Sequence, residues 1–262
     1  MSSILQEILE TKLEEIEDLK SDRKAITLKA YEAKERPSFY KALALDPAPR
    51  LIAEVKKASP SKGVIREDFN PVAIAKSYER GGAVALSVLT DRKYFQGNID
   101  FITGISHSVK IPLLRKDFII DELQILEAKA AGASAVLLIA AALDPAKLAY
   151  LYKFARNLHL QVLLEVHDAE DVKILKKSGC QPRIVGINNR DLNTFEVDLK
   201  TTETVAKLLP YTPDVLVTES GISTFQDVQT LMQYGAKAFL VGESLMRQED
   251  VESATRKLLG TA

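Results

Sequence analysis

Short apolar runs alternate with longer amphipathic stretches along most of the chain. Eight runs rich in leucine and β-branched residues cover residues 51–57, 83–89, 111–117, 135–141, 161–167, 184–190, 214–220 and 238–244. They begin at intervals of roughly 23–32 residues, about the span of one strand, one helix and their loops. Helical periodicity fills several of the intervals, at residues 121–131, 144–158, 169–178, 201–209 and 224–234. The pattern predicts eight successive βα units.

The nearly continuous apolar character of the runs indicates parallel strands covered by helices. Eight such units without an interrupting domain predict a single (β/α)8 barrel, an α/β fold, and a chain of 262 residues suits one such domain. A doubly wound open sheet is the alternative. It is disfavoured because no G-x-G-x-x-G turn follows the first run. We therefore expect one barrel domain over residues 1–262.

Residues 1–50 precede the first unit and are expected to form a helical extension of the barrel. Apolar residues recur there at spacings of three and four, namely Ile4, Leu5, Ile8, Leu9, Leu13 and Ile16. This pattern lasts for less than three full heptads, which is short for a coiled-coil arm. We expect the helix to pack on the barrel.

Polar residues gather toward the carboxyl end of most of the runs. They are Glu54, Lys56, Arg115, Lys116, Asp117, Glu165, His167, Asn188, Asn189, Arg190, Glu219, Ser220, Gly242 and Glu243. Active sites of (β/α)8 barrels lie at this end of the strands. Alternate residues of a strand share a face, so Glu54 and Lys56 point the same way, as do Asn188 and Arg190. The sequence predicts a charged site at the barrel mouth, with a buried structural ion-pair network as the alternative.

Glycine-containing turns follow the last two runs, at residues 219–222 and 241–245. Backbone N–H groups after the seventh and eighth strands form the usual phosphate cradle of such barrels, and glycine lets the backbone approach the anion. A phosphorylated small-molecule ligand is therefore expected. An apolar side of the pocket is expected from residues in or beside the loops that follow the strands, namely Pro60, Phe95, Phe118 and Leu192.

The composition excludes several classes of function. A formal net charge of −1 argues against a general nucleic-acid or anionic-membrane surface. No apolar run is long enough to span a membrane, and the first twenty residues lack the pattern of a signal peptide. The single cysteine, Cys180, has no cysteine partner for a disulfide or a metal site. We expect a cytoplasmic protein without a metal, with a monomer favoured over a weak homodimer.

Five segments of the sequence resemble the motifs of the indole-3-glycerol phosphate synthase family. They are EVKKASPSKG, LTDRKYFQG, PLLRKDFIID, VGINNRDLNTFEVDL and TESGI, and they occur in the family's order. The resemblance extends over about residues 51–245. It implies a cofactor-independent enzyme of tryptophan biosynthesis. Such an enzyme converts 1-(2-carboxyphenylamino)-1-deoxyribulose 5-phosphate into indole-3-glycerol phosphate, with loss of carbon dioxide and water.

The resemblance also implies roles for individual residues. Lys116 would be the general acid in ring closure, and Glu165 the acid–base group in dehydration, assisted by Glu54 and Lys56. Sugar hydroxyls and charged side chains would be oriented by Asn188, Arg190 and Glu219. Ser59 would bind the anthranilate carboxylate. The phosphate would be bound by Ser220, Gly221, Gly242 and the Glu243 loop. The aromatic pocket would be lined by Pro60, Phe95, Phe118 and Leu192.

The chemistry requires these residue types independently of the resemblance. Ring closure places negative charge on a carbonyl oxygen, to which a lysine can donate a proton. We expect the pKa of Lys116 to be lowered by burial and by neighbouring cations such as Lys56. Dehydration requires a base for the ring proton and an acid for the departing hydroxyl, which a carboxylate and an ammonium supply.

Two positions and the function itself leave alternatives open. The family commonly has serine or threonine after the glycine of the last strand, where this chain has Glu243. We expect Glu243 to turn away from the phosphate, which backbone amides would then bind. His167 has no catalytic role in the family and is expected to be a satisfied histidine at a strand end. Alternative functions are an isomerase similar to phosphoribosylanthranilate isomerase, which would need a cysteine near the first strand, and a non-catalytic binder of phosphorylated ligands.

Overall fold

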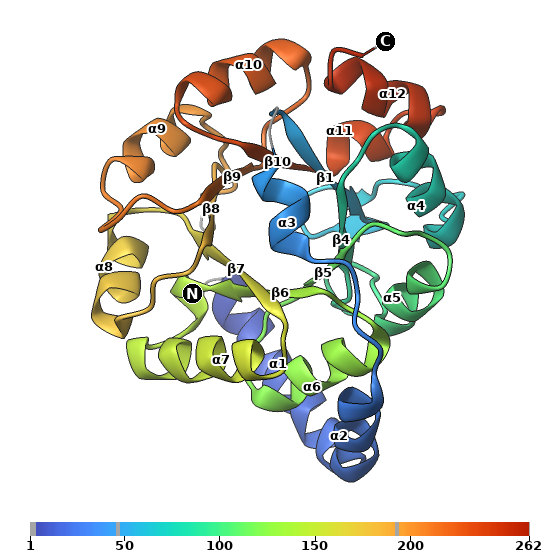
Figure 1. Ribbon diagram of the computed structural model, residues 1–262, viewed down its shortest axis with the longest axis vertical. Helices are drawn as coiled ribbons and strands as arrows, with labels where there is room; N and C mark the ends of the chain where they lie inside the picture. Colours follow the sequence, from blue (N-terminus) through green and yellow to red (C-terminus); the bar gives the residue numbers. More distant parts are fainter. Residues whose placement is uncertain (1–3, 46–47, 192–193, 262) are drawn as a thin grey trace.

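The computed structural model describes residues 4–45, 48–191 and 194–261 of the chain. Within these residues, eight parallel strands close into a barrel in the order β1-β10-β9-β8-β7-β6-β5-β4 (Figure 1). The strands are β1 (Arg50–Val55), β4 (Ala85–Leu89), β5 (Leu113–Lys116), β6 (Ala135–Ile139), β7 (Gln161–Val166), β8 (Ile184–Asn188), β9 (Val215–Glu219) and β10 (Ala238–Val241). The (β/α)8 barrel predicted from the hydrophobic pattern is confirmed.

Helices surround the barrel and join successive strands. They are α4 (Pro71–Arg80), α5 (Ile99–Ser106), α6 (Glu122–Ala131), α7 (Pro145–Asn157), α8 (Ala169–Ser178), α9 (Lys200–Ala206), α10 (Phe225–Gln233), α11 (Glu243–Met246) and α12 (Val251–Leu258), with the 3-10 turn η1 (Ala140–Ala142) after β6. Polar caps fix several starts: the Asp121 side chain accepts from the Leu123 amide at α6, and that of Thr224 accepts from the Asp227 amide at α10. Among the described residues, no helix is long and apolar enough to cross a membrane.

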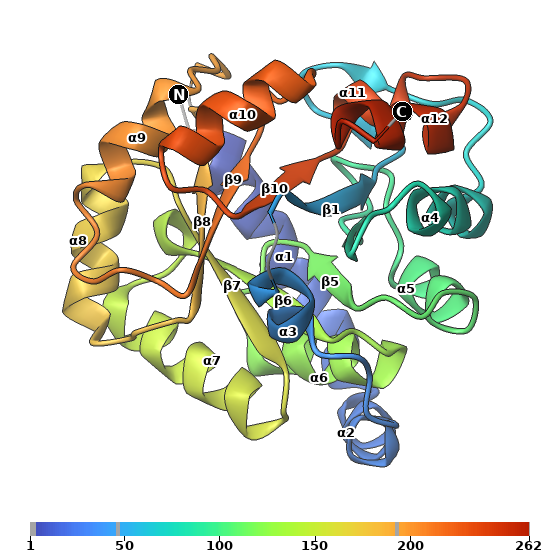
Figure 2. The same ribbon diagram turned by 45° about the horizontal axis from the view of Figure 1, so that its top comes forward.

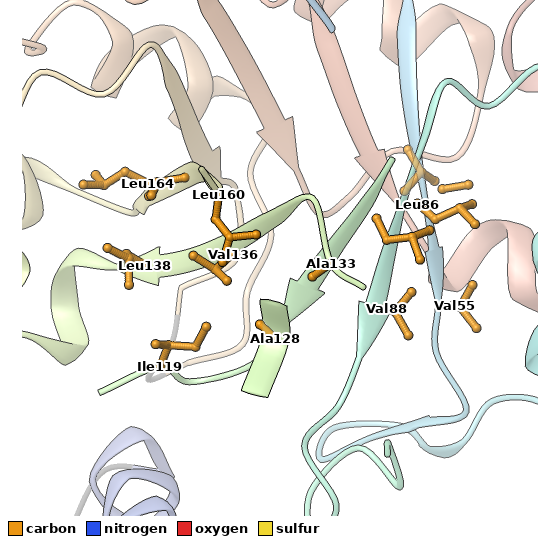
Figure 3. Packing of buried hydrophobic residues seen from close by; sticks show 14 of the residues in the cluster. Val55, Leu86, Val88, Ile119, Ala128, Ala133, Val136, Leu138, Leu160 and Leu164 are labelled. Atoms are coloured by element: carbon orange, nitrogen blue, oxygen red, sulfur yellow. The ribbon is translucent and has the colours of Figure 1, made fainter. Parts of the chain in front are cut away.

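Two apolar cores hold the barrel together. The inner core lies inside the barrel and contains residues such as Ile52, Leu114 and Leu163. The outer core lies between the strands and the helices, and Figure 3 shows part of it, including Val136 and Leu138 of β6. Along β6, Leu137 and Ile139 belong to the inner core while Val136 and Leu138 belong to the outer one. This alternation explains why the strands read as continuous apolar runs.

The N-terminal extension consists of α1 (Ile4–Lys20), α2 (Arg23–Glu32) and α3 (Phe39–Ala44). In Figures 1 and 2, α2 lies outside the barrel beside α6, against which it packs. At the amino-terminal end of the strands, Phe39 and Leu43 of α3 are fully buried and complete the inner core. Because α3 closes this end, the open end of the barrel is the carboxyl-terminal one. A short antiparallel hairpin follows β1, formed by β2 (Ala58–Ser59) and β3 (Gly63–Val64).

Candidate active site

A cavity of about 560 Å³ occupies the carboxyl-terminal mouth of the barrel. It is lined by every residue to which the family resemblance gave a role, except Leu192, which lies outside the described residues; Arg115, His167 and Asn189 of the polar set do not line it. These lining residues are Glu54, Lys56, Ser59, Pro60, Phe95, Lys116, Phe118, Glu165, Asn188, Arg190, Glu219, Ser220, Gly221, Gly242 and Glu243. A volume of this size suits a small-molecule ligand.

Lys116 and Glu165 form the centre of the site. Lys116 ends β5 and points inward, where its Nζ lies 3.1 Å from Glu165 Oε2 and 3.6 Å from Glu219 Oε2. Asn188 of β8 donates a hydrogen bond of 3.2 Å to the other Glu165 oxygen, Oε1. Strand register produces this cluster, because Glu165 pairs with Gly186, and Asn188 pairs with Glu219 on the next strand. One lysine therefore faces two carboxylates within reach of a ligand in the cavity.

The charge states of these three groups depend on one another. Burial alone would lower the pKa of Lys116, but the Glu165, Glu219 and Glu54 carboxylates raise it above its ordinary value. The expected lowering of this pKa is therefore wrong. Burial would raise the pKa of Glu165, but Lys116 and His167 hold it well below the usual range. Burial and the Glu165 charge together raise the pKa of Glu219 well above its ordinary value.

Lys56 does not act on Lys116 in the way we expected, because it is paired elsewhere. Its Nζ lies 2.7 Å from Glu54 Oε2. The two side chains share a face of the strand and its extension, as the alternation predicted. Their pairing balances the charge of Lys56 locally, which explains why the carboxylates, rather than Lys56, determine the pKa of Lys116.

Two glycines make room for the carboxylates. A Cβ atom at Gly186 would overlap Glu219 Oε1, and a Cβ atom at Gly242 would overlap Glu54 Oε2. Gly186 was not singled out in the sequence, although it shares the inward parity of Asn188 in the run IVGINNR. A glycine at an inward-facing position, close to the charged strand ends, is the sequence feature that could have identified Gly186.

Glu219 is buried and has an unusual environment. Among the described residues, neither of its side-chain oxygens has a hydrogen-bond partner. A buried carboxyl group without hydrogen bonds costs free energy, on the order of 1–3 kcal/mol. Such a group at the wall of a cavity is suited to accept a hydrogen bond from a ligand hydroxyl or to share a proton with a neighbour.

His167 closes the back of the site. Its Nε2 lies 3.1 Å from Glu165 Oε1, and its Nδ1 lies 2.9 Å from Asp171 Oδ2 in the first turn of α8. The imidazole was expected to be satisfied at the strand end, but only Nδ1 has a hydrogen-bond partner among the described residues, and Nε2 meets Glu165 as an ion pair. Its contact with Glu165 was not foreseen, although the two residues share the parity of one strand.

The loops after β9 and β10 form the polar rim. Ser220 and Gly221 both have positive φ, at 68° and 81°, which produces a tight turn directly after Glu219. The Ser220 hydroxyl donates to Asn188 Oδ1 at 2.8 Å, and the Ser244 hydroxyl donates to the Ile222 carbonyl at 2.8 Å. These bonds tie the two loops to β8 and to each other.

Glu243 forms an ion pair within α11. Its Oε1 lies 3.0 Å from the Arg247 guanidinium, one helical turn further along. Arg247 also lines the cavity, which brings a cation to this rim that the sequence did not nominate. Binding of a phosphate by the backbone amides here stays a prediction.

The apolar wall combines loop residues with the N-terminal extension. The rings of Phe95 and Phe118 lie 6.3 Å apart, centre to centre. Ile4, Leu5 and Ile8 of α1 line the same cavity. The sequence predicted that this helix packs on the barrel, but its periodicity could not indicate which end of the barrel it covers.

A buried ionic cluster fixes α1 in that position. Lys12 is 0% exposed, and its Nζ lies 2.6 Å from Asp91 Oδ2 and 3.0 Å from Asp117 Oδ1. Asp117 also accepts from Arg115 Nη2 at 3.2 Å. Arg115 and Asp117, part of the polar set in the sequence, therefore have structural partners beside Lys116.

Taken together, these groups can perform proton transfer on a bound anion. An ammonium that donates, a carboxylate that accepts and a protonatable second carboxylate surround one end of the cavity, and an aromatic wall faces the other.

Comparison with known proteins identifies similar sequences over nearly the whole chain. A family model described as "Indole-3-glycerol phosphate synthase" matches residues 5–258. An indole-3-glycerol phosphate synthase of Geobacillus kaustophilus is 52% identical over 261 residues, which cover 98% of this chain and 97% of that protein. The synthase of Priestia megaterium is 49% identical over 259 residues, covering 98% of each.

Solved structures support the fold at lower sequence identity. A 3-hexulose-6-phosphate synthase superposes with a TM-score of 0.64 at 13% identity, covering 81% of this chain and 99% of that one. A thiamine phosphate pyrophosphorylase from Pyrococcus furiosus superposes with a TM-score of 0.58 at 16% identity, covering 80% of this chain and 93% of that one. At these identities the likeness concerns the fold alone.

Proposed function

Because this chain belongs to the indole-3-glycerol phosphate synthase family, we propose that it catalyses that synthase reaction in tryptophan biosynthesis. The enzyme is then a carboxy-lyase that requires no cofactor. Its substrate, 1-(2-carboxyphenylamino)-1-deoxyribulose 5-phosphate, carries a phosphate, a carboxylate and an aromatic ring. The cavity offers a polar rim, paired charges and an apolar wall for these three parts.

Lys116 is the general acid of ring closure. As the aromatic carbon attacks the substrate carbonyl, the ammonium donates its proton to the developing oxyanion. The carboxylates that raise the pKa of Lys116 keep it protonated at neutral pH, so the proton is in place before the substrate arrives. The separation of 3.1 Å between Lys116 Nζ and Glu165 Oε2 is the observation on which the proposal chiefly rests.

Glu165 is the acid–base group of the dehydration that follows decarboxylation. Its lowered pKa keeps it ionised and able to accept a proton from the new ring. Glu54 and Lys56, which lie 2.7 Å apart, assist the departure of the hydroxyl group on the opposite wall. A positioned acid or base of this kind contributes roughly 10²–10⁴-fold in rate.

The remaining residues bind and orient the substrate. Asn188, Arg190 and Glu219 act on the sugar hydroxyls, and the Glu219 oxygens, which have no hydrogen-bond partner among the described residues, suit that purpose. The anthranilate carboxylate is assigned to Ser59, whose buried hydroxyl has no hydrogen-bond partner among the described residues. The phosphate is bound by Ser220, Gly221, Gly242 and the Glu243 loop. The aromatic ring packs against Pro60, Phe95, Phe118 and Leu192.

The test is an assay of the purified protein with the carboxyphenylamino-deoxyribulose phosphate, followed by indole fluorescence. We expect turnover by the wild type and a loss of at least about a hundredfold in kcat for Lys116→Met, since the general acid is removed. Substrate binding, measured by titration calorimetry, should persist in Lys116→Met. Absence of fluorescence at micromolar wild-type enzyme would refute the function, and an unchanged kcat in the variant would refute the role of Lys116.

The organisation of the protein in the cell stays a prediction. We propose one barrel domain, a cytoplasmic location and a monomer, with a weak homodimer as the alternative. Sedimentation velocity over a hundredfold range of concentration distinguishes the two oligomeric states. A sedimentation coefficient that rises with concentration would indicate the dimer.

A further inference from the structure

His167 stands between the central carboxylate of the site and a second, buried carboxylate behind it. Its Nε2 is 3.1 Å from Glu165 Oε1, and its Nδ1 is 2.9 Å from Asp171 Oδ2. The imidazole is nearly buried, with 8% of its side chain exposed, and it does not line the cavity. It therefore touches Glu165 from the side away from the substrate.

Asp171 holds the imidazole in a fixed orientation. The same carboxylate oxygen, Oδ2, accepts from the His167 backbone N–H at 2.8 Å and from the ring nitrogen Nδ1. Asp171 is itself fixed at the start of α8, where its backbone N–H donates to the capping Asp168 side chain at 3.0 Å. Asp171 thus joins the start of α8, the end of β7 and the His167 imidazole, which leaves the imidazole little freedom to rotate.

The imidazole carries a proton at neutral pH. Burial alone would lower the pKa of His167, but hydrogen bonds to Asp171 and Glu165 raise it to about 10. Nδ1 is then hydrogen-bonded to Asp171, and Nε2 faces Glu165 Oε1 as an ion pair at 3.1 Å. The charged groups that face this unit are Lys116 from β5 and Glu219 from β9, both acting on Glu165.

The contacts divide the two oxygens of Glu165 between different partners. Oε1 is held by Asn188 Nδ2 at 3.2 Å and His167 Nε2 at 3.1 Å, whereas Oε2 faces Lys116 Nζ at 3.1 Å. With Oε1 fixed from behind, Oε2 is the oxygen presented to the cavity. This arrangement favours one orientation of the carboxylate and its ionised form.

We propose that His167, oriented by Asp171, is a positioning residue that keeps Glu165 ionised and presents its Oε2 to Lys116 and the substrate. The inference rests on the proposed function, in which Glu165 acts as a base. It assigns to the imidazolium a part in determining the lowest pH at which the enzyme is active. The nearby Glu219 opposes His167 in its effect on the pKa of Glu165, because a negative charge on Glu219 would favour protonation of Glu165.

The first test is the pH profile of kcat in His167→Phe and His167→Gln. Phenylalanine keeps the ring volume without charge or hydrogen bond, while glutamine retains a neutral N–H donor. For His167→Phe we expect the acidic limb to move up by about one pH unit, so that kcat at a given pH on that limb falls roughly tenfold while the plateau near neutral pH is kept. For His167→Gln we expect a smaller shift in the same direction, and in both variants KM should change less than kcat.

His107→Gln is the matched control, because His107 is exposed at the end of α5 and does not line the cavity. Its acidic limb should coincide with that of the wild type. A merely structural role of His167 would lower kcat or the melting temperature without moving the limb. An acidic limb that stays in place in both His167 variants would overturn the proposal.

The second test does not depend on activity. The sequence has three histidines, so the Cε1–H signal of His167 can be identified by NMR as the one lost in His167→Gln. We expect that signal not to titrate between about pH 5.5 and 8.5, and to titrate at lower pH in Asp171→Asn. Titration near pH 6.5 in the wild type would overturn the proposal, even if the Phe variant failed to fold. A wild type without synthase activity would refute the proposed function, and the NMR result would still decide the charge state of His167.

Discussion

In the barrel mouth, the charge state of Lys116 is determined by neighbouring carboxylates rather than by neighbouring cations. Burial was expected to lower the pKa of Lys116, and taken alone it would do so. The structure adds Glu165 and Glu219 within 3.6 Å of its Nζ, and their attraction outweighs the loss of hydration. The sequence identifies these three residues, but only their distances determine the sign of the effect.

Glu165→Gln tests the division of the reaction between the two central residues. The amide cannot accept a proton, so dehydration should slow while ring closure by Lys116 continues. We expect kcat to fall by at least about a hundredfold and an intermediate that has lost carbon dioxide but not water to accumulate. Rapid quenching followed by mass spectrometry detects that intermediate. Quenched samples that contain only unreacted substrate would show that Glu165 acts before dehydration.

Gly186→Ala tests whether the space around Glu219 matters for activity. The added Cβ would overlap Glu219 Oε1 and lie 3.2 Å from Leu163 Cδ1. We expect a loss of about 1–3 kcal/mol in the free energy of unfolding and a fall in kcat of roughly tenfold or more, because the carboxyl group must move. Urea unfolding and the indole assay measure the two effects.

Gly104→Ala is the control for that substitution. Gly104 lies in α5, and a Cβ there would meet only Val72 Cγ2, at an ordinary 3.5 Å. Alanine should stabilise the helix by about 0.5–1 kcal/mol and leave kcat unchanged. Equal effects of the two alanines would contradict the importance of Gly186.

At the scale of elements, α1 covers the mouth of the barrel because of one buried side chain. Lys12 is paired with Asp91 after β4 and with Asp117 after β5. The heptad-like apolar pattern predicts a helix, but lysine at position 12 reads as a solvated residue in the sequence. Its partners are about 80 and 105 residues away, so no local pattern could reveal the contact.

Lys12→Met should loosen α1 and destabilise the protein. The substitution leaves the buried Asp91 carboxylate without its cation and Asp117 with Arg115 alone, which costs about 3–5 kcal/mol. Urea unfolding measures this loss. On the same helix, Lys20→Met removes an exposed pair with Glu17 and should cost less than about 1 kcal/mol. Similar losses in the two variants would show that the buried cluster does not hold the helix.

The strand ends were predictable from the sequence for a physical reason. Inward and outward residues alternate on a strand, so Glu54 and Lys56, or Asn188 and Arg190, could be assigned to one face before their partners were known. Closure of the barrel then brings all the strand ends together. The contacts of His167 and Arg247 depend on side-chain orientations that the pattern does not define, and they could not be predicted.

At the scale of the whole molecule, stability should depend on pH in opposite ways through two neighbouring carboxyl groups. The folded-state pKa of Glu219 is raised, so the folded protein binds the proton more tightly and this group lowers stability as pH rises above its unfolded pKa of about 4.3. The folded-state pKa of Glu165 is lowered, so its contribution is present above about pH 4.3 and is lost as pH falls.

Glu219→Gln should therefore be more stable than the wild type at pH 7, while Glu165→Gln should be less stable. The Glu219 difference should vanish as pH falls toward about 4, whereas the Glu165 difference should persist there and be lost only at lower pH. Urea unfolding at several pH values measures them, and the isosteric substitutions serve as controls for each other. Differences of the same sign at pH 7 would contradict the assigned charge states. A stabilising loss of Glu219 would identify a carboxyl group retained for activity at the expense of stability.

The cavity is walled both by Ile4 and Leu5 of the first helix and by Ser244 and Arg247 beyond the last strand. Between them, β1 and β10 pair directly and close the barrel, with Leu51 opposite Phe239. During synthesis, α1 and β1 therefore meet their partners after β4 and β5 early, but β10 only near the end. Neither the ring of strands nor the wall of the cavity can be complete before that last strand is made.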